Sequence, residues 1–145
     1  MEKHDWVVVA NGSQARIMER SAARGHAWTE SDRLLHPEAR EHGTDTHGKT
    51  AGHTISGRPG LAPRQENKEH HRQIFCRQIA EKLHRGVLSG SVSGIVIFAA
   101  PTMMGELLKE LDEGTRKLIV SHHEKDLTSL PVAELNDRLR KDFNL

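Results

Sequence analysis

The residues best suited to chemistry lie in a polar stretch, residues 36–65, and at the start of the helix expected after it. The candidate binding residues are glycines and basic or amide residues in close succession: Gly57, Arg58, Gly60, Arg64, Gln65, Lys68 and Arg72. Arginine holds phosphate oxygens through paired hydrogen bonds, and glycine lets a partner approach the backbone N–H groups. This pattern indicates a contact with RNA phosphates. The alternative is a solvent-exposed turn before a helix.

Arg72 has two interpretations of its own. It projects from the same face of the expected helix as Cys76, one turn earlier. There it could brace the polar stretch or reach a ligand at the helix start. It could also simply pair with Glu69, three residues earlier on the helix, or with Glu66.

The sequence does not contain the residues needed for a P-loop or for a two-metal nuclease site. The run from Gly52 to Gly57 continues with Arg58-Pro59, where a phosphate-binding P-loop needs lysine and then serine or threonine. The strands expected at 6–10 and 95–100 contain no carboxylate, whereas two-metal nucleases need acids there. Asp5 and Asp126 lie only beside strands. We therefore expect no catalytic residues, no cofactor and no enzyme activity.

Histidine is unusually frequent, with 11 residues, of which His42, His47 and His53 lie in the polar stretch. A flexible segment could gather three imidazoles around a metal ion. However, no pair stands four residues apart on the expected helix, and no His-Glu-x-x-His is present. We expect these side chains to be solvated and no metal to be bound, although a small hydrolase using this His-rich stretch stays open.

The cysteine count and the net charge argue against a disulfide-stabilised protein and against binding driven by overall charge. The single cysteine, Cys76, cannot form an internal disulfide, and its position on an apolar helix face predicts a buried thiol with a raised pKa. Lys and Arg total 21 against 20 Asp and Glu, so net charge gives no argument for nucleic acid or an anionic membrane. The N-terminal residues do not resemble a signal peptide, and no apolar run is long enough to span a membrane. A cytoplasmic protein is expected.

The elements that position these residues follow from hydrophobic periodicity. Strands are expected at 6–10, 14–20, 26–35, 95–100 and 117–121. Helices are expected from Glu66 to Arg85, from Pro101 to Gly114, and after a cap at Thr128 or Ser129. Gly86 is expected to end the first helix, and Val132, Leu135, Leu139 and Phe143 to line the inner face of the last.

This order predicts an α/β fold. Right-handed crossovers give a mixed five-stranded sheet, order 3-2-1-4-5, with helices on both faces. We expect residues 1–145 to form one domain with a flexible loop at about 36–65, between strand 3 and helix 1. That stretch has few aliphatic side chains, so it cannot bury enough to order itself.

The sequence resembles the bacterial host-attachment family, "protein required for attachment to host cells". The resemblance is carried by Val7–Ile17, Gly57–Gly60, Ala99–Leu107 and Lys125–Pro131. The strand order is similar to the ribonuclease-H-like sheet of the translational-machinery superfamily, which includes the middle domain of archaeal and eukaryotic peptide-chain release factors. In that domain a glycine-rich loop before a long helix carries Gly-Gly-Gln into the ribosome. Here Gly57–Gly60, with Gln65 further on, occupies the corresponding place without that triplet.

The resemblance implies a release-factor-like binding protein rather than peptide release. We expect a non-catalytic protein that contacts ribosomal RNA, tRNA or a ribosome-associated protein through the Gly/Arg-rich loop. A protein-interaction factor that influences host attachment without touching RNA is the alternative.

Overall fold

The computed structural model describes residues 3–21, 27–36 and 57–145, with side chains of 57–66 excepted. Its five strands are β1 (His4–Ala10), β2 (Gln14–Ser21), β3 (Thr29–Leu35), β4 (Val92–Ala99) and β5 (Ile119–His123). They form one sheet in the order β3-β2-β1-β4-β5, as predicted. The neighbours β3, β2 and β1 are antiparallel, whereas β1, β4 and β5 run parallel.

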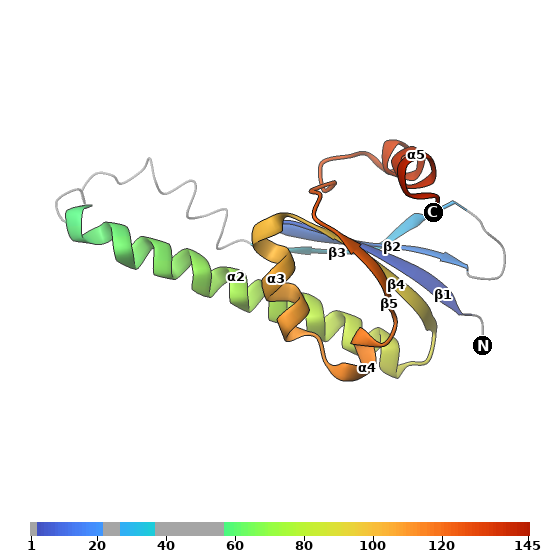
Figure 1. Ribbon diagram of the computed structural model, residues 1–145, viewed down its shortest axis with the longest axis horizontal. Helices are drawn as coiled ribbons and strands as arrows, with labels where there is room; N and C mark the ends of the chain where they lie inside the picture. The colour runs from blue at the N-terminus through green and yellow to red at the C-terminus, as the bar shows by residue number, and fades with distance from the viewer. Residues whose placement is uncertain (1–2, 22–26, 37–56) are drawn as a thin grey trace.

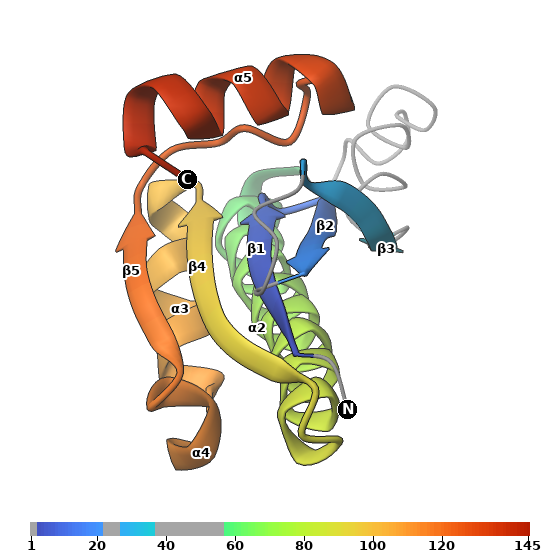
Figure 2. The same ribbon diagram turned by 90° about the vertical axis from the view of Figure 1, so that its right-hand side faces the viewer.

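Helices cover both faces of the sheet, which confirms the predicted α/β class (Figure 1). One face carries α2 (Gly57–Leu88), α3 (Pro101–Glu110) and the short α4 (Glu113–Arg116), and the other carries α5 (Val132–Phe143). Figure 2 shows α5 lying across the sheet on the side away from α2. The apolar run of β1 is explained by this arrangement, because a strand covered on both faces buries every side chain.

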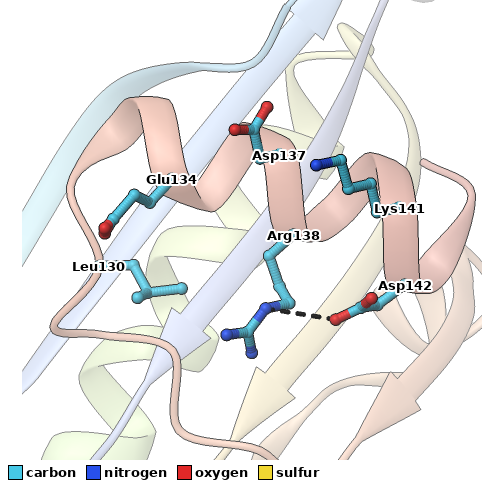
Figure 3. Close-up of a pocket in the computed structure, with 6 residues that line it drawn as sticks. All are labelled: Leu130, Glu134, Asp137, Arg138, Lys141 and Asp142. Atoms are coloured by element: carbon cyan, nitrogen blue, oxygen red, sulfur yellow. Dashed lines mark ion pairs between the residues drawn. The ribbon is translucent and has the colours of Figure 1, made fainter.

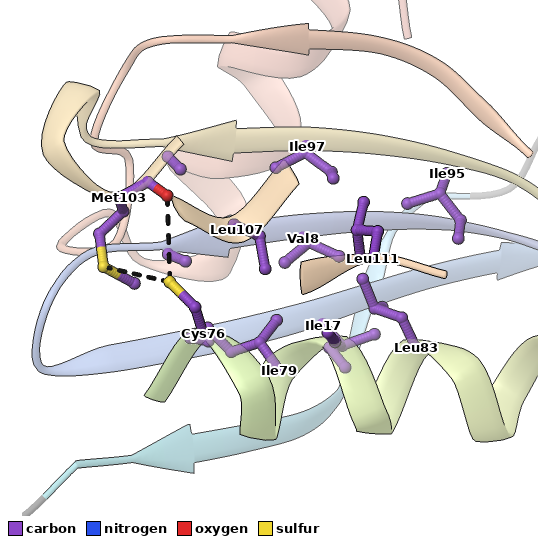
Figure 4. Packing of buried hydrophobic residues seen from close by; sticks show 14 of the residues in the cluster. Val8, Ile17, Cys76, Ile79, Leu83, Ile95, Ile97, Met103, Leu107 and Leu111 are labelled. Carbon is purple, nitrogen blue, oxygen red and sulfur yellow. Dashed lines mark hydrogen bonds between the residues drawn. The ribbon is translucent and has the colours of Figure 1, made fainter. Parts of the chain in front are cut away.

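Each face of the sheet has its own hydrophobic core. On the α2 side, Val8 of β1 packs with Ile79 and Leu83 of α2 and Leu107 of α3 (Figure 4). On the α5 side, a smaller cluster forms around β1, β4 and α5; it includes Val7, Val9, Phe98, Leu135 and Leu139. The inner face expected for α5 is confirmed at Leu135 and Leu139, but Val132 is exposed.

The expected start of the first helix is wrong. Helix α2 begins at Gly57, so residues 57–65 are helical and do not belong to a loop. The apparent breaker Pro59 lies in the first turn, where the backbone N–H groups have no helical acceptor and a proline costs little. His36, the first residue after β3, belongs to the expected flexible loop but is buried and stacks on Phe75. The remainder of the expected loop, 37–56, lies outside the described residues.

Several other boundaries differ from expectation. Strand β3 begins at Thr29 and not at residue 26, because residues 27 and 28 are not in a strand and residue 26 is not described. Gly114 does not end α3; it lies in α4, whose N-cap Asp112 accepts a hydrogen bond from the Thr115 N–H. Thr128 does not cap α5, which starts after Pro131. The Thr128 hydroxyl instead accepts a hydrogen bond from Asn11, in a network that connects the segment before α5 to the end of β1.

Gly86 lies within α2 and does not end it, because the helix continues to Leu88. A Cβ at this position would overlap the ring of Trp6, 2.7 Å from Cζ3 and closer still to Cη2. Glycine is therefore required by the close approach of α2 to β1. The positive φ that follows the helix, 77°, belongs to Gly90.

We expect Gly86→Ala to destabilise the fold by about 1–3 kcal/mol, the usual cost of overpacking a core. Urea denaturation monitored by tryptophan fluorescence would measure the change. Gly105→Ala is the matched control, because Gly105 lies in α3 with nothing within 4 Å of an added Cβ. That change should leave stability equal or raise it by about 0.5–1 kcal/mol. Equal destabilisation by both would contradict the contact with Trp6.

Candidate functional site

Helix α2 is longer than the sheet it packs on. Its 32 residues span about 48 Å at 1.5 Å per residue, whereas the eight residues of β4 span about 26 Å. Its buried side chains begin at Phe75, while Asn67 to His70 are exposed. The N-terminal half of α2 therefore projects beyond the body of the molecule (Figure 1).

The structure places all the predicted binding residues on this helix. Gly57, Arg58, Gly60, Arg64 and Gln65 lie in its first nine residues, where the backbone alone is described. Lys68 is exposed and Arg72 is half-buried. Positions 64, 68 and 72 are four residues apart and therefore follow one side of the helix.

The two cations of this set with described side chains, Lys68 and Arg72, have no acidic partner among the other described side chains. In the part of the chain with described side chains, no carboxylate lies within 4.0 Å of the Lys68 ammonium or the Arg72 guanidinium, so the simple pair of Arg72 with Glu69 is not formed. Arg72 acts electrostatically on Cys76, one turn further on. Neither charge is therefore neutralised by a described carboxylate, and Glu66, the other acid considered for Arg72, lies outside the described side chains.

Cys76 does not belong to a reactive site. Burial raises the pKa of its thiol to about 12, with further increases from Glu106 and Glu110 that outweigh the opposing effect of Arg72. Its Sγ contacts the Met103 carbonyl oxygen at 4.0 Å and the Met103 Sδ at 3.9 Å (Figure 4). A protonated thiol in such surroundings is a packing group.

Two of the described histidines, His36 and His123, also serve packing. His36 stacks on Phe75 with ring centroids 4.9 Å apart, and its ring lies 5.7 Å from that of His71. His123 stacks on Phe98 at 4.9 Å beneath Phe143 of α5. Within residues 3–21, 27–36 and 57–145, no group of three or more His, Cys, Asp or Glu side chains is placed to hold a metal. His42, His47 and His53 lie outside the described residues.

The two carboxylates considered for a nuclease lie at opposite ends of the parallel strands. Asp5 lies at the start of β1, where it accepts a hydrogen bond from Ser93 Oγ at 2.7 Å. Asp126 lies beyond the end of β5, which runs in the same direction as β1. Carboxylates so placed cannot share the two metals of a nuclease centre.

Asp126 instead has a structural role. Its Oδ1 accepts hydrogen bonds from the Thr128 N–H and hydroxyl, and its Oδ2 accepts one from Asn11 Nδ2. Partial burial would raise the pKa of Asp126, but these hydrogen bonds to the ionised form lower it on balance. The network fastens the segment before α5 to the turn after β1.

The segment before α5 is also held by Arg16, a role that was not identified from the sequence. Arg16 is buried in β2 and donates hydrogen bonds to the carbonyl oxygens of Thr128 and Leu130, at 2.9 and 2.6 Å. Its Nε also pairs with Glu30 at 2.8 Å. The alternation of polar and apolar residues in β2 does not indicate that Arg16 is buried. Its carbonyl partners are more than a hundred residues away, so local sequence does not reveal them.

A surface depression of about 250 Å³ lies on α5 (Figure 3). Leu130 and charged residues of both signs line it: Glu134, Asp137, Arg138, Lys141 and Asp142. Arg138 pairs with Asp142 one turn later at 3.2 Å, and the lining charges are exposed. Solvated charges of mixed sign do not favour one ligand, so this depression is a poor candidate site.

The described part of the molecule thus defines an α/β domain that presents a projecting polar helix, without a recognisable catalytic centre. The chain belongs to the family described as "Protein required for attachment to host cells", whose model matches residues 6–139. None of the curated proteins compared matches it.

Among solved structures, the chain is similar to an archaeal translation termination factor, aRF1. The similarity covers 97% of this chain at 11% sequence identity with a TM-score of 0.48. The chain spans 39% of that protein. No described helix has the length and apolar character needed to cross a membrane.

Proposed function

We propose that this protein is a non-catalytic RNA-binding member of its family that contacts ribosomal RNA or tRNA through the projecting half of α2. The observation that carries the proposal is the overhang of that helix, about half its length, with Lys68 and Arg72 lacking acidic partners among the described side chains. An unpaired cation on a projecting element can approach phosphates and displace their counterions.

The composition of the overhang favours a polyanion over an apolar partner. Residues 57–72 include Arg58, Arg64, Lys68 and Arg72 against Glu66 and Glu69, and Leu61 is the only large aliphatic residue among them. A coiled-coil or groove-binding helix would need apolar residues at every third or fourth position. Arg64, Lys68 and Arg72, which are four residues apart, match a charged backbone instead.

We expect Arg58→Ala/Arg64→Ala/Lys68→Ala to weaken RNA binding and to lower the salt dependence of the binding constant. The slope should fall by about one unit for each phosphate that the variant no longer neutralises. Fluorescence anisotropy with labelled tRNA, at low and physiological salt, measures both. Co-sedimentation with ribosomes tests the same variants in a complete particle. The melting temperature should change little, because the substituted positions lie on a projecting helix end.

The control variant is Lys117→Ala/Lys125→Ala/Lys141→Ala, which removes the same charge from exposed positions on the rest of the domain. It should retain the wild-type salt slope. Equal weakening by the two triple variants would show a general charge effect, and a wild-type protein that neither binds tRNA nor sediments with ribosomes would refute the proposal.

A further inference from the structure

A second concave surface lies far from the projecting helix end, between α3 and the edge strand β5. This pocket, of about 350 Å³, is lined by Leu108, Lys109, Arg116, Ile119 and His122. Leu108 and Ile119 pack against the core beneath and remain half exposed. The pocket therefore has an apolar floor and a basic rim.

A register shift in β5 creates this arrangement. Ile119 lies opposite Ile95 and His122 opposite Ile97, so both face the α3 side, and Val120 is the additional residue between the paired positions. Val120 is 71% exposed. Such a bulge bends an edge strand and redirects its side chains.

The charge on the rim is uncompensated. None of the five lining residues is acidic. Among residues with described side chains, no carboxylate lies within 4.0 Å of the Lys109 or Arg116 cations, and Arg116 Nη2 donates to the Leu108 carbonyl at 2.8 Å. Of the nearby acids, Glu110 pairs with Arg77 at 3.4 Å and Asp112 accepts from Thr115. Glu106 and Glu113 are described as well, and neither forms an ion pair with Lys109 or Arg116.

The edge of the sheet adds main-chain groups to this surface. Strand β5 has a neighbour on one side only among the described strands, so its outer N–H and C=O groups face away from the sheet. The bulge at Val120 disfavours a long additional strand but leaves room for a short extended segment. The half-exposed floor is too open for a small ligand, which needs burial of most of its surface.

We propose that this pocket, named the α3–β5 pocket, binds a short acidic peptide segment of a protein partner. An aliphatic side chain would cover Leu108 and Ile119, and flanking carboxylates would pair with Lys109 and Arg116. Charge complementarity selects the acidic partner, and the apolar floor supplies the anchor. The inference does not depend on RNA binding by α2.

The test uses a short synthetic peptide with a central leucine flanked by acidic residues, titrated into the full chain with ¹³C-labelled methyl groups. We expect saturable shifts of the Leu108 and Ile119 methyl signals with Kd of about 1 mM or below. A peptide with lysines in place of the acids, and one with glycine in place of the leucine, should bind at least about tenfold more weakly.

Charge reversal provides the matched variants. Lys109→Glu/Arg116→Glu should lose affinity for the acidic peptide and bind the basic one, while Lys117→Glu/Lys125→Glu, with the same charge change outside the pocket, should behave as wild type. The proposal fails if no shift occurs up to about 10 mM, if the three peptides bind equally, or if the shifts lie elsewhere. It also fails if a single-stranded oligonucleotide shifts the same methyl signals at lower concentration than the acidic peptide.

Discussion

Replacing Arg16 by methionine is expected to lower the free energy of unfolding by about 3 kcal/mol. The Arg16 side chain is 2% exposed, and its guanidinium bonds the Thr128 and Leu130 carbonyls and Glu30. Methionine restores the buried volume but removes the side-chain donor of the Thr128 and Leu130 carbonyls, whereas Glu30 keeps its hydrogen bonds from Arg33. Because the two carbonyls immediately precede α5, the substitution should also loosen that helix.

Urea denaturation measures the global change, and amide hydrogen exchange of α5 reports the local one. Arg33→Met is the matched control, because Arg33 pairs with the same carboxylate at 2.8 Å but is 47% exposed. The hydrogen bond from Arg33 is the largest cause of the lowered pKa of Glu30. Even so, an exposed pair contributes little to stability, so its removal should cost less than about 1 kcal/mol. A cost for Arg16→Met no greater than for Arg33→Met would refute the interpretation.

Phe75→Ala is expected to destabilise the protein by about 3–5 kcal/mol, the usual cost of removing a fully buried phenylalanine. Phe75 has no exposed surface and stacks on His36 at the end of β3, with ring planes 16° apart. It is also the first buried residue among the described side chains of α2, where the helix leaves the sheet. Its removal should therefore increase hydrogen exchange in the turns of α2 next to the overhang.

Gln78→Ala on the same helix is the control for Phe75→Ala. Gln78 is exposed, so this substitution should change stability by less than about 0.5 kcal/mol. Chemical denaturation of both variants measures the difference. A change below about 1 kcal/mol for Phe75→Ala would mean that the contact between α2 and the sheet does not depend on this side chain.

The sheet could be predicted because its pattern is local. The apolar runs of β1 and β4 identify strands covered on both faces, and their burial in the structure agrees. The buried stripe of α3, with Met103, Met104 and Leu107, follows from its spacing in the same way. Connection rules then favour the observed strand order, because short right-handed crossovers place the fourth strand beside the first.

The candidate site was predicted only in part. Sequence reasoning selected Lys68 and Arg72 from their charge and place before the core, and the structure puts both on α2. It could not show that the helix starts at Gly57 and overhangs the sheet, because glycines and prolines in succession are typical of turns as well as of first helical turns. The length of α2 relative to the strands is a property of the assembled layers.

The pocket bordered by Lys109 and Arg116 could not be predicted from the sequence, for a different reason. They belong to separate helices, and nothing in their spacing indicates that both border the apolar surface of Leu108 and Ile119. The bulge that turns Ile119 and His122 to the same side depends on pairing with β4. Pockets of this kind follow from the positions of elements rather than from any motif.

The sequence by itself determined which segments are apolar on one face or on both, and hence the class and order of the sheet. The tertiary structure alone decided the roles of single residues. Gly86 does not end a helix but allows α2 to approach Trp6 closely. Arg16 donates hydrogen bonds to carbonyl oxygens 112 and 114 residues away. Periodicity records whether a side chain is buried, because burial repeats with the local geometry of a helix or strand. The partner of a buried polar or tightly packed group is fixed only through space, once distant elements have met.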